Sequence, residues 1–342
     1  MAFKRSAVRS RSSPPYKKMN LKEICLPISR ELEELEKTLA SHLISKFPFI
    51  DGVVNYVIHN GGKRLRPLLT ILSSKMGGYQ GAHSISIGAA IEFMHTASLL
   101  HDDVVDNANL RRGRPTINIK WGNQVCVLVG DFFYCRAMDI LVKQGDMKIL
   151  RVVTDAITTT TEGEIFEIIK SNDPATTEDD YLKIISYKTA ALIGSACQAG
   201  AILGSISEDF ELALKDYGQY LGMAFQLMDD VLDYTSTEEE FGKANGTDLR
   251  EGKLTLPLIV ALKKSTENEA TFIKNALMGD VLEKTAFNQV FELISKYDGI
   301  NETTKLAQSY VQKAKDKLTK FKPSIERDAL LNIADYVVLR RN

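Results

Sequence analysis

Two short acidic motifs with the same spacing constrain this chain more than any other feature of its sequence. Residues 102–106 read Asp-Asp-Val-Val-Asp and residues 229–233 read Asp-Asp-Val-Leu-Asp, each in the frame L-x-D-D-V-x-D. Both motifs, called here the first and the second box, end a long apolar run with helical periodicity. The sequence therefore predicts two core helices that face each other and carry carboxylates at matching positions.

The carboxylates of a box are close enough to share a cation. Asp102 and Asp106 are one helical turn apart and lie on one helix face. They repel each other unless positive charge lies between them, and Mg²⁺ often bridges carboxylates and a substrate phosphate. A single box would more often be a solvated acidic helix end, but the repeated frame favours a metal site. We expect Mg²⁺ to be bound by Asp102, Asp106 and Asp229. The other aspartates are candidate ligands or supporting partners: Asp103, Asp230 and Asp233.

A basic turn precedes the first box. Residues 61–67 read Gly-Gly-Lys-Arg-Leu-Arg-Pro, and Lys63 and Arg66 are three positions apart, so one helical turn would direct both at one group. Alone, this string is more often an exposed turn, but beside two metal boxes it predicts a diphosphate site. His95, two turns before Asp102 on roughly the same face, would by itself be a core residue.

Further polar residues flank the apolar runs. Arg111 and Arg112 follow the first box, where they can bind two anions or balance the charge of the box. Lys188 directly precedes a nineteen-residue stretch without formal charge, 189–207, which begins with Thr189. Its length raises a transmembrane question, but its Ser, Gln and Gly content predicts a packed interior helix. Gln226, a turn before Asp229, is placed to contact substrate or metal-bound water.

The composition narrows the class of protein. The length of 342 residues suits one large or two small domains, and a hydrophobic content of 44% suffices for a large core. The net charge of −1 argues against a nucleic-acid partner. The four cysteines have neither metal-ligand nor disulfide spacing. Few prolines and long periodic runs predict an all-α protein, with a single domain over residues 19–342.

Residues 1–18 differ from the rest of the chain. They are basic and rich in serine, and no acidic residue occurs before Glu23. Such a composition can mark a mitochondrial transit peptide, but Pro14 and Pro15 would interrupt an amphipathic helix. We therefore predict a disordered tail on a cytoplasmic protein, with a mitochondrial location as the alternative.

Taken together, these motifs resemble those of the all-trans isoprenyl diphosphate synthases, and most of all the long-chain octaprenyl type. The first box with Arg111-Arg112-Gly113 resembles the first aspartate-rich motif of that family, and residues 225–230, Phe-Gln-Leu-Met-Asp-Asp, resemble the second. The resemblance extends from about Met19 to the C-terminus. It implies a single large helical bundle around a deep central cavity and a homodimer. It also implies Mg²⁺, three ions in the ternary complex, with Mn²⁺ able to substitute.

The resemblance also divides the polar residues between two substrates. The diphosphate of isopentenyl diphosphate would be bound by Lys63, Arg66, His95 and Arg112. The diphosphate of an allylic substrate such as farnesyl diphosphate would be bound by Arg111, Lys188, Thr189 and Lys253. Lys243, in the polar segment 235–252, is a weaker match than Lys253. The expected reaction is ionisation of the allylic C–O bond, attack by the isopentenyl double bond and loss of a proton. No side-chain base is obvious near the boxes, so the released diphosphate is the expected proton acceptor.

The residues just before the first box bear on product length. Short-chain members of the family typically carry a bulky side chain at the fourth or fifth position before the box, where this chain has Ser98 and Ala97. We therefore predict a long product, about C35 to C50 with octaprenyl favoured, for quinone side chains, since each buried CH₂ contributes ~0.8 kcal/mol. The tunnel floor would be Phe132, Phe133 or Met138. Alternatively, the small residues only permit close packing, and the cavity is closed by Phe93 or Met94.

Three alternative functions remain open at this point. A terpene cyclase shares the first motif, but its second metal motif typically mixes Asn, Ser or Thr with Glu. A short-chain farnesyl or geranylgeranyl synthase would differ from a long-chain synthase only in the cavity below the first box. A non-catalytic subunit of a heteromeric synthase would lack aspartates or basic residues that are intact here. A long product also suggests transient membrane contact during release.

Overall fold

The computed structural model describes residues 20–59, 61–235, 246–278 and 284–340. The predicted tail 1–18 and Lys243 lie outside the described residues. Within them the protein is all-α, as predicted, apart from one antiparallel hairpin after the first box, made of the two-residue strands β1 (Leu110–Arg111) and β2 (Arg114–Pro115).

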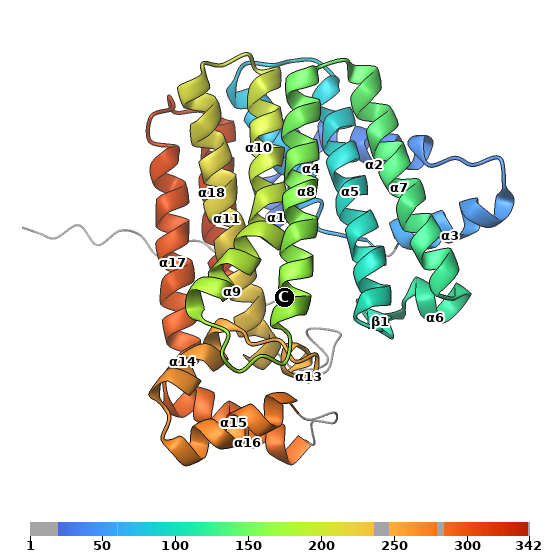
Figure 1. The fold of residues 1–342 in the computed structure, drawn as a ribbon. Helices are drawn as coiled ribbons and strands as arrows, with labels where there is room; N and C mark the ends of the chain where they lie inside the picture. Colours follow the sequence, from blue (N-terminus) through green and yellow to red (C-terminus); the bar gives the residue numbers. More distant parts are fainter. Residues whose placement is uncertain (1–19, 60, 236–245, 279–283, 341–342) are drawn as a thin grey trace, which may run out of the picture.

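The helices up to residue 170 form the first part of a bundle (Figure 1). They are α1 (Leu21–Ile24), η1 (Leu26–Ile28), α2 (Ser29–His42), α3 (Pro48–His59), α4 (Leu65–Met76), α5 (His83–Val105), α6 (Ile117–Trp121), α7 (Asn123–Gln144) and α8 (Met147–Lys170). The helices that follow complete the bundle. They are α9 (Glu178–Ile185), the π-helical turn η2 (Ser186–Ala190), α10 (Ala191–Leu203), α11 (Glu208–Thr235), α13 (Thr247–Arg250), α14 (Leu256–Lys264), α15 (Glu267–Met278), α16 (Lys284–Lys296), α17 (Gly299–Lys317) and α18 (Ile325–Leu339).

Helix α10 lies in the middle of the bundle. It packs against α4, α8 and α11, and more lightly against α5 (Figure 1). Each residue from Leu192 to Ala201 is buried, which explains why this part of the uncharged stretch carries no charge. The predicted interior helix is therefore confirmed. Among the described residues, no helix combines the length and the apolar character needed to cross a membrane.

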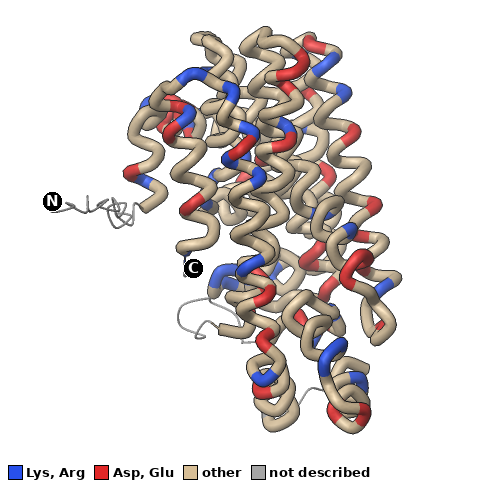
Figure 2. Tube along the Cα trace, turned by 90° about the vertical axis from the view of Figure 1, so that its left-hand side faces the viewer, with Lys and Arg blue, Asp and Glu red and all other residues tan. Residues whose placement is uncertain are grey.

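The two boxes end the two helices that define the site. The first box lies at the C-terminus of α5 and the second in the last turns of α11. Both helices run toward the lower end of the bundle in Figure 1, where α9 and α13 also lie. The boxes therefore meet at one end of the fold. Figure 2 shows acidic and basic residues interspersed along the helices in that view, in keeping with the net charge of −1.

Local sequence signals predict several helix boundaries well. The sequence Thr177-x-x-Asp180 has the spacing of a capping box, and the two residues form one at the start of α9. Leu35 and Leu39 have the spacing of a core-facing helix, and both are buried on α2. The apolar run over about 120–142 predicts a single helix, but the structure has two helices, α6 and α7. They are separated by Gly122, whose positive φ of 87° interrupts the helical backbone.

Candidate active site

A short segment, 246–253, joins the two boxes. The backbone N–H groups of Thr247 and Asp248 each donate to the Asp233 carboxylate over 3.2 Å. At the other end of the segment, Lys253 Nζ lies 3.4 Å from Asp106 Oδ2. This segment therefore contacts both boxes. The two boxes belong to one site, as their repeated frame predicts.

The carboxylates of the first box have different surroundings. Asp103 is buried, and its Oδ1 contacts Arg111 Nε at 2.8 Å and Nη2 at 2.7 Å. Arg111 therefore has the charge-balancing role considered from the sequence, while its contact with a diphosphate remains a prediction. Burial, followed by the nearby charge of Glu164, raises the pKa of Asp102 to about 7. Negative charge at Asp102 is thus unfavourable in this environment, and a cation would relieve it.

In the second box, two aspartates are committed to internal contacts. Asp230 accepts hydrogen bonds from Tyr181 Oη at 2.5 Å and Gln226 Nε2 at 2.8 Å. Burial raises its pKa to about 7 although both donors favour the charged form. Asp230 and Asp233 are only 2% and 5% exposed, whereas the Asp229 side chain is 31% exposed. Asp229 is therefore the carboxylate of this box that is most accessible to a ligand, as predicted for a metal-binding residue.

The donor set fits a hard divalent cation. Asp102, Asp106 and Asp229 offer carboxylate oxygens from two helices at the same end of the bundle. Over the described ranges, no three or more His, Cys, Asp or Glu side chains form a ready-made metal cage. An ion that completes its shell with water and substrate phosphate, as Mg²⁺ does, matches such an open site.

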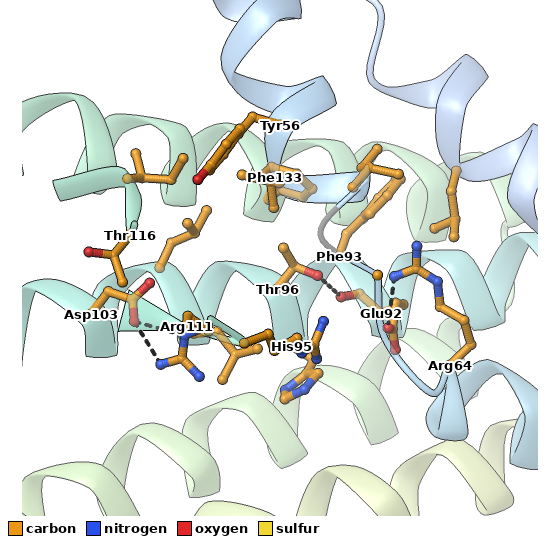
Figure 3. Close-up of a pocket in the computed structure, with 18 of the residues that line it drawn as sticks. Tyr56, Arg64, Glu92, Phe93, His95, Thr96, Asp103, Arg111, Thr116 and Phe133 are labelled. Atoms are coloured by element: carbon orange, nitrogen blue, oxygen red, sulfur yellow. Dashed lines mark hydrogen bonds and ion pairs between the residues drawn. The ribbon is translucent and has the colours of Figure 1, made fainter. Parts of the chain in front are cut away.

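Cationic side chains line a pocket on one side of α5, called here the arginine pocket (Figure 3). Its polar wall includes Arg64, Glu92, His95, Arg111 and Arg112. Arg64 is held by Glu36 at 2.9 Å and by Glu92 at 3.3 Å. Burial, reinforced by the charges of the surrounding arginines, lowers the pKa of His95 well below its ordinary value. The protonated form of His95 is therefore disfavoured, and the residue lies within a cationic cluster rather than in the plain core.

Lys63 and Arg66 lie next to this pocket but do not share a helical turn, contrary to the expectation from their spacing. Helix α4 begins only at Leu65, and Arg64 before it has a left-handed backbone with φ 47°. The negative charge of Asp229 nevertheless favours a higher pKa for both Lys63 and Arg66. Burial lowers the pKa of Arg66 to about 10, and its buried Nε has no hydrogen-bond partner among the described residues. A buried guanidinium N–H of this kind suits an anionic ligand.

A second pocket, called here the lysine pocket, lies between α8, η2, α11 and the segment 246–253. Its lining includes Glu167, Tyr181, Lys188, Thr189, Gln226, Asp230 and Lys253. Lys188 Nζ lies 2.8 Å from Glu164 and 2.5 Å from Glu167. Thr189 Oγ1 donates to Gln226 Oε1 over 2.9 Å. The residues matched to the allylic diphosphate are thus brought together, apart from Arg111, which lines the arginine pocket.

Arg340 is a site residue that the sequence reasoning missed. The amphipathic stretch 254–342 has no chemical motif in its sequence, yet Arg340 lies at the site. Arg340 Nη2 donates to Asp229 Oδ1 over 2.7 Å and to the Phe225 carbonyl over 2.8 Å. Its side chain is 3% exposed. In the sequence, Arg340 is one of two adjacent arginines, 340 and 341, and this pattern does not indicate which residue Arg340 contacts.

Three more polar residues were missed: Glu167 and Tyr181, which line the lysine pocket, and Glu164, which contacts Lys188. Glu164 and Glu167 are three positions apart on a helix that the sequence predicts, so their shared face could have been found. That this face meets Lys188 depends on how α8 packs against η2. Tyr181 reads as an ordinary apolar position, and nothing local indicates its bond to Asp230.

The residues proposed to control product length are in close-packed surroundings. Ala97 is fully buried in the core cluster that also contains Phe93 and Phe133, and Ser98 Oγ donates to the carbonyl of His95. The Phe93 and Phe133 rings meet edge to face with centroids 5.6 Å apart and line the apolar end of the arginine pocket. Neither Ala97 nor Ser98 lines the arginine or lysine pocket, so their role in a tunnel remains a prediction.

The fold and the paired aspartate boxes define an all-α prenyltransferase. A family model described as polyprenyl synthetase matches residues 47–294, and the chain belongs to this family, whose members are transferases of the polyprenyl diphosphate synthase type. The chain is 39% identical over 324 residues to octaprenyl diphosphate synthase of Haemophilus influenzae, covering 95% of this chain and 98% of the relative.

Solved structures agree with this assignment. A polyprenyl synthase from Caulobacter crescentus, crystallised with calcium and isoprenyl diphosphate, superposes with a TM-score of 0.92 at 38% identity, covering 96% of this chain and 100% of that one. Other relatives differ in product or assembly. Heptaprenyl diphosphate synthase component 2 of Bacillus subtilis is 34% identical, and the match covers 92% of this chain and 89% of that relative. A short chain isoprenyl diphosphate synthase of Methanothermobacter thermautotrophicus is 36% identical, and the match covers 84% of this chain and 89% of that relative.

Proposed function

We propose that this protein adds isopentenyl diphosphate units head to tail to an allylic diphosphate and makes a long-chain product, with octaprenyl diphosphate favoured. The observation that carries the proposal is the arrangement of two separate pockets, each with basic side chains in its lining, beside the paired aspartate boxes. Two diphosphates can each be bound by basic side chains while both approach the same carboxylates.

The arginine side of the site suits isopentenyl diphosphate. Lys63, Arg66 and Arg112 offer positive charge, and a ring N–H of His95, whose pKa is lowered by burial, can donate a hydrogen bond. Arg66 presents the guanidinium N–H that lacks a partner among the described residues. These residues would hold the diphosphate so that the double bond of the C5 chain points toward the boxes.

The lysine side suits the allylic diphosphate. Burial opposes the charge of Lys188, but Glu167 and Glu164 outweigh burial and raise its pKa. Lys253 is likewise kept charged by Glu167, Glu251 and Asp106 against the effect of burial. Two fixed ammonium groups would stabilise the negative charge that develops on the leaving diphosphate as the allylic C–O bond breaks.

Mg²⁺ held by Asp102, Asp106 and Asp229 would supply further positive charge to the diphosphate. The electrons of the isopentenyl double bond then form the new C–C bond to the allylic carbon. A proton leaves the resulting cation to give a product five carbons longer. The charged side chains of the lysine pocket are paired with one another, so we assign the proton to the released diphosphate.

The long-chain assignment rests on two points. Ala97 and Ser98 are small, and the similarity to an octaprenyl synthase covers nearly the whole of both chains. The alternatives are a short-chain synthase and a non-catalytic subunit of a heteromeric enzyme. Against the second alternative, both boxes and the basic residues that such a subunit would lose are present.

We also propose a homodimer. The neighbouring elements α5, β1, α6 and α7 (Figure 1) each carry one of four exposed apolar residues: Val105, Leu110, Ile119 and Leu128. Burial of these residues against a second copy would remove apolar surface from water. We propose a cytoplasmic location, with a mitochondrial one as the alternative, and membrane contact only as a long product leaves.

The decisive experiment incubates the purified protein with Mg²⁺, farnesyl diphosphate and labelled isopentenyl diphosphate and sizes the products. Products of about C35 to C50 from the protein alone support the proposal. Products that stop at C15 or C20 would identify a short-chain enzyme. Activity that requires a second polypeptide would identify a subunit.

A further inference from the structure

Two glutamates on α8 face the lysines of the lysine pocket. Glu164 and Glu167 are one turn apart, and each contacts Lys188 Nζ, at 2.8 Å and 2.5 Å. Glu167 also lies 3.7 Å from Lys253 Nζ through the same Oε2 atom. One carboxylate oxygen is therefore shared by two lysines that come from different parts of the chain.

The backbone brings these groups together by two close approaches. A Cβ on Gly163 would lie 2.6 Å from the Lys188 amide nitrogen, so a side chain there would push α8 away from η2. Beyond the end of α8, the Asn172 N–H donates to the Gly252 carbonyl over 2.8 Å. This bond holds Gly252, the residue before Lys253, next to the end of α8. The backbone positions from which Lys188 and Lys253 reach Glu167 are therefore both fixed.

When two lysines share a buried pocket, the positive charge of each one disfavours the charged form of the other. Lys188 has Glu164 as a second partner, and Lys253 has Glu251 at 2.7 Å and Asp106 at 3.4 Å. Among the carboxylates of the described residues that pair with either lysine, Glu167 is the one that contacts both. Without its charge, each lysine would be drawn toward its own separate partner.

We propose that Glu167 is a positioning residue that holds the Lys188 and Lys253 ammonium groups side by side for the leaving diphosphate. The inference rests on the proposed function, because it assigns that diphosphate to the lysine pocket. Glu167 itself makes no bond to substrate in this scheme. Its negative charge weakens diphosphate binding in the ground state but sets the geometry needed as the C–O bond breaks.

This role predicts an unusual kinetic pattern for Glu167→Gln. The amide keeps the size of the side chain but loses the charge that holds two cations. We expect kcat to fall by roughly tenfold to a hundredfold, while the KM for the allylic substrate stays within about twofold of wild type or decreases. Glu167→Asp, which restores the charge, should recover part of the lost kcat.

Two controls separate positioning from general damage. Glu162→Gln makes the same change on an exposed position of α8 and should leave kcat and both KM values unchanged. The second control measures binding of inorganic pyrophosphate by calorimetry, which does not depend on turnover, and we expect Glu167→Gln to bind it as tightly as wild type or more tightly.

The outcomes distinguish the hypotheses. Wild-type kcat in Glu167→Gln would overturn the positioning role. So would a large rise in the allylic KM together with weaker pyrophosphate binding and a lower melting temperature, because that pattern indicates a structural ion pair. If wild type binds pyrophosphate but makes no prenyl product, the proposed function fails instead.

Discussion

Arg340 links the C-terminus of the chain to the second box, and its removal tests that link directly. Its Nη2 donates to Asp229 and to the Phe225 carbonyl, and its guanidinium lies 3.8 Å from the centroid of the Phe225 ring. Arg340→Ala would remove all three contacts. The side chain is 3% exposed, so little water would replace them without rearrangement.

The size of the effect follows from these contacts. Breaking a buried ion pair costs about 3–5 kcal/mol, but the Asp229 side chain is 31% exposed and can be partly solvated. We therefore expect Arg340→Ala to lose about 2–3 kcal/mol of unfolding free energy, near the range for a charged hydrogen bond. For a chain of 342 residues, the melting temperature should fall by roughly 3–4 °C.

The same substitution should affect one substrate more than the other. The charges of Arg340 and Asp229 both act on the pKa of Lys63, so the substitution changes the charge next to a residue on the isopentenyl side. The apparent KM for isopentenyl diphosphate should rise about tenfold, which corresponds to ~1.4 kcal/mol, with the allylic KM nearly unchanged. Arg340→Lys keeps the charge but lacks the planar fork, so it should recover only part of both losses.

Thermal unfolding and steady-state kinetics on the same preparations would test this reasoning. Arg327→Ala is a matched control, because Arg327 also lies on α18 and donates to the Leu318 carbonyl, away from the boxes. It should leave both KM values unchanged. The reasoning is refuted if Arg340→Ala matches wild type in melting temperature and in isopentenyl KM, or if the allylic KM alone changes.

Three further predictions concern metal, substrates and product length. Asp102→Ala and Asp229→Ala should each reduce turnover by orders of magnitude in folded protein, and a chelator should abolish wild-type activity until Mg²⁺ is restored; near-normal turnover in both variants would contradict the two-box site. Arg112→Ala should chiefly raise the KM for isopentenyl diphosphate and Lys188→Ala should chiefly impair the allylic substrate, so exchanged effects would reverse the assignment of the two pockets. Ala97→Tyr adds a ring about 7.5 Å along α5 from Asp102 and should shorten products to about C15–C20; an unchanged product distribution would show that the chain does not pass Ala97, and circular dichroism would check for overpacking of the core.

Local patterns in the sequence predicted the elements that depend on near neighbours. Helical periodicity located α2, the uncharged stretch 189–207 located α10, the Thr177–Asp180 spacing marked the start of α9, and the apolar runs before the boxes located both boxes at helix ends. These features follow from interactions within one or two turns, so a single stretch of sequence contains all the information that they need.

Only the tertiary structure decided which partner each charged side chain has. Asp229 meets Arg340 across 111 positions, Asp230 meets Tyr181 across 49, and Lys253 meets Asp106 across 147. Such pairs form because whole helices pack at fixed distances, and no local pattern specifies which faces meet. The sequence by itself therefore determined the kind of chemistry available at the boxes, whereas packing determined which distant side chain each carboxylate of the boxes contacts.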